Sequence, residues 1–479
     1  MKRLVRSGKF FSIICHLHRR PSRVLAVVLA FTFWLLGAAT GWTQTNIQLV
    51  LHTFTNNPDG SAPINSLVSG VDNALYGVTA QGGTDASGGI LFKINPDGTG
   101  YTILHQFSSS DTGGSGLIFP PVVVLTVMQA SNGTLYGTTY AGGTNSYGSI
   151  FRLNSDGSLY TVIHSFSAAD TGPSSLIQGR DGELYGTTLQ TVFRFDPTSG
   201  NYNILHTFTG APDGSVAFGK LIQANDGALY GTTYFGGTNS EGCVFKVTTN
   251  GNIYAELHAF SGNPDGADSY AGVMQGNDGM LYGTTRIGGT NNQGTVYKLN
   301  LDGSSYQVIC NFAGTADGDS PLGSLVQGPG NVLYGTTASG GTENNGTVFA
   351  LNPDGSGLDI LHNFINAPDG AGPYAGLTLG TFTGGTGALY GTTTTGGTSG
   401  SGTLFAFLIN PPLSITPVRS QTTNNQTVVF WPVWALNYTL QSTTNLTSGT
   451  WVTASNGVPV SGFQLTNNAP AVFYRLLRQ

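Results

Sequence analysis

The chain has 479 residues and a formal net charge of −6, and 71 residues are glycine whereas only 9% are charged. A chain with so few basic residues lacks the positive surface that nucleic acids require, so we expect no DNA- or RNA-binding function. Glutamate occurs four times, and short aromatic and β-branched runs alternate with Asp-Gly turns. This composition predicts an all-β protein built from many short strands.

Residues 1–41 have the layout of a secretory signal peptide. They contain seven basic residues and no acidic residue, with an apolar run over 24–39 and small residues up to Gly41. We expect cleavage near Ala39-Thr40-Gly41. The alternative is a retained membrane anchor, but this run of 16 residues is shorter than the ~20 residues that span a bilayer.

Cleavage would leave 11 basic residues against 24 acidic residues, which is a net charge of −13. Such a charge disfavours binding to nucleic acid and to anionic lipid. We therefore predict a secreted or cell-surface monomer that does not insert into the membrane once the signal is removed.

The sequence Leu-Tyr-Gly occurs seven times, with 45 to 60 residues between successive copies. Internal repeats with periods of this order are typical of solenoids and propellers. The tyrosines of the seven copies are Tyr76, Tyr136, Tyr185, Tyr230, Tyr282, Tyr334 and Tyr390.

Each repeat unit contains four segments with the character of short strands. Examples are Leu221-Ile222-Gln223, Leu-Tyr-Gly-Thr-Thr, the stretch from Gly294 to Leu299, and Leu205-His206-Thr207-Phe208. Four antiparallel strands per unit predict a propeller blade, so we expect a seven-bladed β-propeller over 42–410. An eight-bladed ring or two smaller rings are the alternatives.

The order of the segments predicts how the ring closes. The mature chain begins with a strand of the fourth type around His52, and the last unit ends with a strand of the third type around Leu404. We therefore predict a 3+1 clasp, in which the strand at 49–54 pairs beside the strand at 402–408.

The same order assigns the connections between strands to two faces. Short Asp-Gly turns occupy one face, and the other carries the Gly-Gly-Thr-x-x-x-Gly loops and the loops that contain Pro-Asp-Gly. We call these the short-turn face and the long-loop face, and we expect the functional site on the latter. Unit three lacks the Gly-Gly loop after Tyr185 and unit two has an insertion over 113–127, which fits either a pocket or repeat drift.

The repeat stops near residue 411. Segments such as 428–431 and 438–446 show the alternation of strands, so we predict a small β-sandwich-like domain of 5–7 strands over 411–479. Two consecutive prolines, Pro411 and Pro412, predict a stiff hinge before it.

The motif set resembles the GloVer tandem-repeat family of bacterial exported proteins. The motifs that carry the resemblance are Leu-Tyr-Gly-Thr-Thr, Gly-Gly-Thr, Gly-Thr-Val-Phe-Lys-Leu, Asp-Gly and Leu-His-x-Phe, over 49–408. The resemblance implies a secreted or surface bacterial protein. The family has no defined biochemical role, so the resemblance transfers no catalytic residue.

The recurring histidines fit a structural role better than metal ligation. They occupy one position of the repeat and therefore lie around a ring, where they cannot converge on one ion. Cys310 stands at the same position in another unit, and Cys243 stands where other units have Thr or Ser, so we expect no disulfide between them. The histidines are His52, His105, His164, His206, His258 and His362.

We predict no cofactor. Asp317-Gly318-Asp319 is the closest approach to a calcium site, but turn capping explains these aspartates without a metal. Glycosidase chemistry needs two carboxylates about 5–9 Å apart, and the four glutamates fall in different units. An extracellular glycan-active enzyme with its site at the propeller's central channel is the alternative function.

Six residues of the long-loop face are candidate ligand-binding residues, because the units differ most there. Aromatic side chains stack on sugar rings and asparagine supplies hydrogen bonds, although the same residues could instead pack between loops. We predict a noncatalytic binding or adhesion protein whose ligand is a polysaccharide or a surface protein; a spacer without a ligand is a third reading. The six residues are Tyr140, Tyr147, Tyr234, Phe235, Arg286 and Asn239.

Overall fold

The computed structural model describes most of the repeat region and parts of the C-terminal region. The fully described residues are 47–84, 88–108, 125–382 and 387–409, and five strands are described between residues 426 and 478. The predicted signal peptide lies outside the described residues. Within the described part of the chain, no helix is long and apolar enough to cross a membrane.

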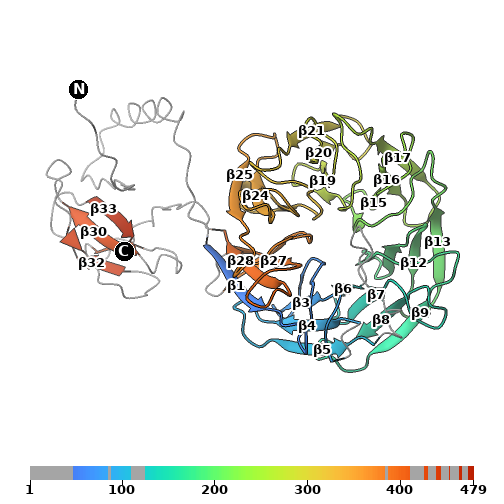
Figure 1. The fold of residues 1–479 in the computed structure, drawn as a ribbon, viewed down its shortest axis with the longest axis horizontal. Helices are drawn as coiled ribbons and strands as arrows, with labels where there is room; N and C mark the ends of the chain where they lie inside the picture. The colour runs from blue at the N-terminus through green and yellow to red at the C-terminus, as the bar shows by residue number, and fades with distance from the viewer. Residues whose placement is uncertain are drawn as a thin grey trace. The chain divides into compact units, whose positions relative to one another are not determined.

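Residues 46–383 and 387–409 form one compact unit, and this unit is the predicted seven-bladed β-propeller (Figure 1). Each blade is a four-stranded antiparallel sheet whose first strand is innermost, beside the central cavity. Blade one comprises β2 (Val68–Ser69), β3 (Leu75–Val78), β4 (Ile90–Ile94) and β5 (Thr102–Gln106). Blade two comprises β6 (Leu125–Gln129), β7 (Leu135–Thr139), β8 (Ser149–Leu153) and β9 (Thr161–Ser165).

The remaining blades follow the same order around the ring. Blade three comprises β10 (Ser175–Gln178), β11 (Leu184–Thr187), β12 (Thr191–Phe195) and β13 (Tyr202–Thr207). Blade four comprises β14 (Ile222–Gln223), β15 (Leu229–Thr233), β16 (Cys243–Val247) and β17 (Tyr254–Ala259). Blade five comprises β18 (Met274–Gln275), β19 (Leu281–Thr285), β20 (Thr295–Leu299) and β21 (Gln307–Asn311). Blade six comprises β22 (Val326–Gln327), β23 (Leu333–Thr337), β24 (Thr347–Leu351) and β25 (Asp359–Asn363), with a 3₁₀ turn at Pro329–Asn331.

Blade seven closes the ring through a 3+1 clasp, which confirms the prediction. Its inner strands are β26 (Thr378–Thr381), β27 (Gly387–Thr393) and β28 (Thr403–Leu408), and its outer strand is β1 (Ile47–Thr53). The register runs from Ile47 opposite Leu408 to Thr53 opposite Thr403, with an irregularity between Val50 and His52.

The Leu-Tyr-Gly motif is explained by packing inside and between blades. In blade four, a Cβ on Gly231 would lie 2.7 Å from Cζ of Phe245 on the next strand, so only glycine leaves room for the aromatic ring. Tyr230, in the same motif, is fully buried and packs with Leu281 and Tyr297 of blade five. The core therefore consists of layers between neighbouring blades.

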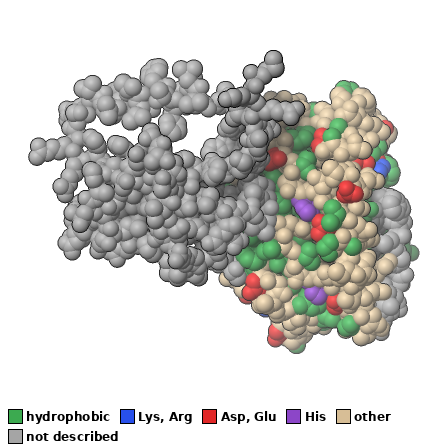
Figure 2. Space-filling view, turned by 60° about the vertical axis from the view of Figure 1, so that its left-hand side comes forward, with side chains coloured by type: hydrophobic (Ala, Val, Ile, Leu, Met, Phe, Trp, Pro, Cys, Tyr) green, Lys and Arg blue, Asp and Glu red, His purple; other side chains and the backbone are tan. Residues whose placement is uncertain are grey.

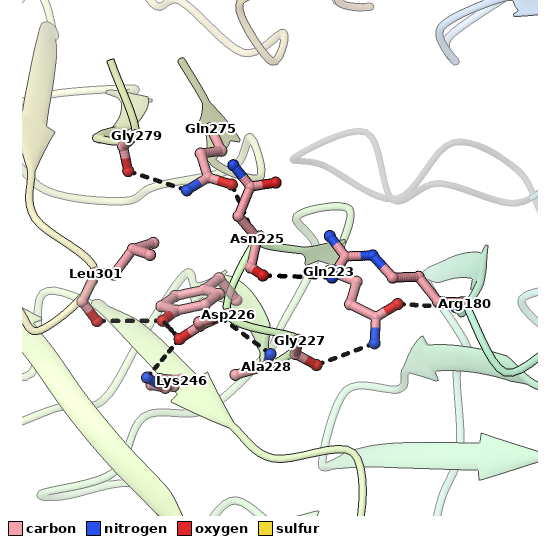
Figure 3. A network of polar contacts seen from close by, with 11 residues as sticks. Arg180, Gln223, Asn225, Asp226, Gly227, Ala228, Lys246, Gln275, Gly279 and Leu301 are labelled. Atoms are coloured by element: carbon pink, nitrogen blue, oxygen red, sulfur yellow. Dashed lines mark hydrogen bonds and ion pairs between the residues drawn. The ribbon is translucent and has the colours of Figure 1, made fainter. Parts of the chain in front are cut away.

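On the short-turn face, the repeat tyrosine anchors the turn that precedes its strand. The hydroxyl of Tyr230 donates to the carboxylate of Asp226 at 2.7 Å, and Lys246 Nζ lies 2.8 Å from the same carboxylate (Figure 3). Equivalent Tyr–Asp hydrogen bonds of 2.6–2.8 Å occur in blades one, three and five. Each turn is thereby tied to the buried core of its own blade.

In blades two to six, a glutamine at the end of the inner strand bonds to the turn of the preceding blade. Gln275 accepts a hydrogen bond from the backbone N–H of Asn225 in blade four at 2.9 Å and donates to the carbonyl of Gly279 at 3.0 Å (Figure 3). We call this pair of bonds the glutamine bridge. The same pattern recurs at Gln129, Gln178, Gln223 and Gln327.

Blades two and three carry the predicted departures from the repeat. In blade three, residues 188–190 alone connect β11 to β12, so the long loop is missing as predicted. Most of the insertion predicted over 113–127 lies outside the described residues, and β6 begins at Leu125.

The second compact unit includes residues 410–479, and its described backbone is also β. The pair β29 (Gln426–Val429) and β32 (Phe463–Thr466) forms one sheet. A second sheet has the order β31 (Val452–Thr453), β30 (Tyr438–Thr443), β33 (Phe473–Arg478). The small β-sandwich-like domain of 5–7 strands stays a prediction, because the described residues cover only parts of 411–479.

Candidate ligand-binding site

In blades one, four, five, six and seven, the long-loop face is built from two loops that pair with one another. In blade four, Ser215 of the Pro-Asp-Gly loop forms a β-bridge with Phe235 of the Gly-Gly-Thr loop, and Gly236 bridges to Glu241. Both glycines of the Gly-Gly pair have positive φ, 73° at Gly236 and 76° at Gly237, which favours glycine over other residues. The paired loops give this face a fixed frame.

A histidine and an aspartate hold the Pro-Asp-Gly loop to the outer strand. His206 Nε2 lies 2.9 Å from Asp213, whose other carboxylate oxygen accepts hydrogen bonds from the N–H and hydroxyl of Thr209. Histidine side chains lie beside acidic ones on the outer surface of the propeller (Figure 2). We call this arrangement the His–Asp clamp, and it recurs as His52–Asp59, His258–Asp265 and His362–Asp369 at 2.7–3.1 Å.

The same histidine also stacks on the next blade. The rings of His206 and Tyr254 are 3.7 Å apart at their centroids and nearly parallel, at 7°, and the hydroxyl of Tyr254 donates to the carbonyl of Asp213. Burial lowers the pKa of His206 below its usual value, and Asp213 only partly offsets this effect. The structural interpretation of the histidines is confirmed by these contacts.

The acidic residues and cysteines of the described propeller have structural surroundings. In the described part of the chain, no group of three or more His, Cys, Asp or Glu side chains is placed to hold a metal ion. Asp317 accepts a hydrogen bond from the N–H of Ala313 at 2.6 Å, which is the turn-capping role expected of it. Cys243 and Cys310 are buried free thiols, and burial raises their pKa to about 12.

Two of the six predicted ligand-binding residues are exposed aromatics on the long-loop face. Tyr147 of blade two is 40% exposed and Phe235 of blade four is 49% exposed. Among the residues that the structure describes, they are the only aromatic side chains in the set of exposed large hydrophobic residues. Both side chains are therefore accessible to a ligand on this face.

Three of the six predicted ligand-binding residues pack between loops. The sequence analysis gave this packing as the alternative to ligand binding. Tyr234 is 3% exposed and packs with Phe218 and Tyr270, and Tyr140 lies at the edge of the same cluster. Arg286 Nη2 lies 2.7 Å from the Asp268 carboxylate, and its guanidinium stands 5.9 Å from the Tyr234 ring centre.

The asparagines of this face brace their own loops. The side-chain amide of Asn239 donates to the carbonyl of Ala259 at 3.1 Å. Asn145 and Asn291 make the same bond, to Phe166 at 3.0 Å and Phe312 at 2.9 Å. One N–H of each of these amides therefore serves the loop itself, and the bond fixes the position of the side chain.

Tyr147 and Phe235 stand on either side of blade three, where the long loop is missing. Leu189 in the short connection of blade three donates its N–H to Thr171 and accepts a hydrogen bond from Val216 N–H of blade four. The carbonyl of Tyr147 accepts a hydrogen bond from Gly172 N–H. A continuous hydrogen-bonded backbone thus joins the loops that carry the two aromatics.

The central channel contains a cavity of about 120 Å³ lined by residues from all seven blades. Lys220 is the single lysine or arginine in this lining, and Asp, Glu and His are absent from it among the described residues. The sequence analysis did not single out Lys220. An alignment of the units could have revealed it, because this lysine stands where other units have the small residues Ser66, Gly272 and Ser324.

The chain belongs to the Gloeobacter/Verrucomicrobia repeat family, because the family model matches residues 37–226 and 217–428. This match confirms the family resemblance inferred from the motifs. No curated protein matches the sequence.

Solved structures share the propeller fold at low sequence identity. A streptogramin B lyase is 12% identical with a TM-score of 0.50, and the match covers 77% of this chain and all of the lyase. The extracellular domain of a putative hybrid two component system from B. thetaiotaomicron is 11% identical with a TM-score of 0.50. That match covers 75% of this chain and 39% of the other. These likenesses establish the fold alone.

Proposed function

We propose that this protein is an exported, noncatalytic binding protein that holds a polysaccharide on its long-loop face, above blades two to four. One observation carries the proposal: Tyr147 and Phe235 are the exposed aromatic side chains of the described propeller, and both belong to loops of this face. The signal-like sequence of residues 1–41 supports export.

The chemistry of sugar binding suits these two side chains. The faces of sugar rings present C–H groups that stack on aromatic rings, and a tyrosine adds a hydroxyl that hydrogen-bonds at its rim. The short connection of blade three leaves no long loop between the two aromatics. An extended chain of several sugar units can therefore contact both.

A rigid frame favours binding because little conformational entropy is lost when the ligand arrives. Phe235 is held by its β-bridge to Ser215, and the Tyr147 loop by hydrogen bonds to its own blade and to Gly172. The aromatic rings are thus presented on backbone that is already ordered.

The enzyme alternative places a catalytic site in the central channel. Glycan hydrolysis needs a pair of carboxylates, and the residues that line the channel in the described part of the chain include neither Asp nor Glu. The geometry therefore favours binding over glycan cleavage.

A glycan-array assay on residues 42–479, with and without calcium, tests the proposal. We expect saturable binding to at least one polysaccharide, reduced at least tenfold by Tyr147→Ala or Phe235→Ala. Ile365→Ala is the matched control, because Ile365 is 51% exposed on a long-loop connection of the opposite side of the ring. It should bind as the unaltered protein does.

Two results would overturn the proposal. One is a folded protein that binds no glycan on the array, which would direct the search to a protein partner. The other is binding that survives the double variant Tyr147→Ala, Phe235→Ala, which would move the site away from blades two to four.

A further inference from the structure

The inner strands place one cationic side chain inside the propeller. Lys220 lies two residues before Ile222, the residue that pairs with the repeat tyrosine of blade four. Its side chain lines the central cavity and is accessible to solvent, although protein surrounds it. We call the ring of residues at this height the middle level.

The other blades surround Lys220 with small and hydroxylated residues. In every blade, one inner-strand residue pairs with the repeat tyrosine, and the residue two positions before it is equivalent to Lys220. The seven residues of the middle level are Ser66, Thr126, Ser175, Lys220, Gly272, Ser324 and Gly376. The level therefore has one positive charge, four hydroxyl groups and no negative charge.

Two glycines at this level bring the strands close to the lysine. A Cβ on Gly272 would lie 2.0 Å from the carbonyl oxygen of Lys220, and a Cβ on Gly376 would lie 2.6 Å from the carbonyl oxygen of Ser324. Only residues without a side chain fit at these two positions. Lys220 and the hydroxylated residues line the same cavity.

The charge on Lys220 lacks compensation from the protein. Within the described residues, Lys220 forms no ion pair and no side-chain hydrogen bond, and burial is the one influence on its pKa, which it lowers. The hydroxyls of Ser66 and Ser324 likewise form no hydrogen bond to the described protein. All three side chains are accessible from the channel, so they can bind a ligand there without first breaking a contact within the described protein.

The geometry points to a site for a small oxyanion at the middle level of the central channel. Lys220 would supply the positive charge, and Ser66 and Ser324 would donate hydrogen bonds to the oxygen atoms of a carboxylate, phosphate or sulfate group. The cavity of about 120 Å³ has room for a small polyatomic ion or for several water molecules.

Two features make the site selective for anions of small size. The channel lining offers no carboxylate in the described part of the chain, so a cation would find no counter-charge. Phe218, Tyr270 and Leu322, two positions earlier in their strands, pack together and narrow the long-loop end of the channel. A lysine is also a better partner for a compact oxyanion than for a neutral sugar.

This proposal is independent of the polysaccharide site, because Tyr147 and Phe235 do not line the channel. We would titrate inorganic phosphate, sulfate, acetate and glucuronate into residues 42–479 by calorimetry at constant ionic strength. Lys220→Met should weaken binding of the preferred anion at least tenfold. Lys298→Met, which removes a lysine outside the channel lining whose Nζ contacts the carbonyl of Pro353, should change it less than twofold.

The four anions also identify the source of the charged group. A preference for phosphate or sulfate identifies a free ion, and a preference for glucuronate over acetate identifies an acidic sugar. The double variant Ser66→Ala, Ser324→Ala provides a second test if Lys220→Met fails to fold. It should weaken binding of the preferred anion about fivefold or more.

A second readout follows the lysine directly. After reductive ¹³C-methylation, the NMR signal that is lost in Lys220→Met belongs to Lys220, and saturating anion should raise the pKa of that group. The proposal is wrong if none of the four anions binds, if Lys220→Met binds as well as the unaltered protein, or if the pKa of Lys220 stays unchanged on binding.

Discussion

The two faces of the propeller are held together in different ways. On the short-turn face of blade four, the turn is bonded to the core by a Tyr–Asp pair and to the next blade by a glutamine bridge. On the long-loop face, the His–Asp clamp closes the loop on its own strand, and a stacked tyrosine provides the link to the next blade.

This difference shows where sequence variation is tolerated. The glutamine bridge uses backbone groups, so the residues of the short turns must keep their geometry. The clamp instead fixes the base of a Pro-Asp-Gly loop. Residues of the neighbouring Gly-Gly-Thr loops, such as Tyr147 and Phe235, vary between units. The long-loop face is therefore free to carry a ligand site without loss of the frame.

The largest expected effect comes from removing the acid of a clamp. Asp213→Ala leaves His206 and two groups of Thr209 without their acceptor, and the Asp213 side chain is only 16% exposed. We expect a loss of about 2–3 kcal/mol in the free energy of unfolding, measured by urea denaturation.

Asp226→Ala provides the comparison on the short-turn face. It removes three contacts as well, but the side chain is 31% exposed, so water replaces part of them. We expect a loss of about 1–2 kcal/mol. Equal losses, or a larger loss for Asp226→Ala, would contradict the proposed difference between the faces.

A smaller effect is expected from one glutamine bridge. Gln275→Ala removes the acceptor of Asn225 N–H and the donor to the Gly279 carbonyl. We expect a loss of about 1 kcal/mol in stability, with faster hydrogen exchange at the amide of Asn225. Unchanged exchange at that amide would show that the bridge does not restrain the turn.

The smallest expected effect is the pH dependence of stability that the histidines of the His–Asp clamps produce. Burial lowers the pKa values of His52 and His206 below the unfolded value of 6.5. The unfolded chain therefore binds protons first as the pH falls, so stability is complete above about pH 6.5 and declines below it. Thermal unfolding at pH 7.5 and 5.5 should show a lower midpoint at pH 5.5.

The variant His206→Cys, which copies the natural Cys310 of blade five, should reduce that difference in midpoint. A midpoint that rises on acidification, or a difference that His206→Cys leaves unchanged, would argue that the buried histidines do not control the pH response.

Repetition made the fold predictable to an unusual degree. Comparing units revealed that Cys310 replaces a histidine, and the structure pairs Cys310 with Val296 as it pairs His362 with Val348. The clasp followed from the order of strand types alone. Both predictions rest on the equivalence of units, which a single non-repeating sequence does not offer.

Burial at the centre of the ring was harder to predict. Tyr234 follows the second strand of its blade, as Tyr140 does. Nothing in the local sequence shows that Tyr234 packs against Phe218 and Tyr270, which belong to two different blades. Lys220 was missed for a similar reason, because a lysine on a short strand normally faces bulk water. Such contacts depend on seven blades meeting at one axis.

The glutamine bridge missing between blades six and seven has a simple local reason that the sequence contains. A bridge from blade seven to blade six would need the N–H of residue 329, which is Pro329 and has none. Leu379 stands where the glutamine would be, in the register defined by Thr378 opposite Tyr390. Donor and acceptor are thus lost together.

The clasp also decides how the propeller is oriented toward its surroundings. Because Ile47 lies opposite Leu408, the chain enters and leaves the ring at one corner of one blade. Strand β28 runs from the long-loop face toward the short-turn face, so this corner lies on the short-turn side. Segments that precede residue 47 and that follow residue 408 therefore attach on the short-turn side, opposite the face that carries Tyr147 and Phe235.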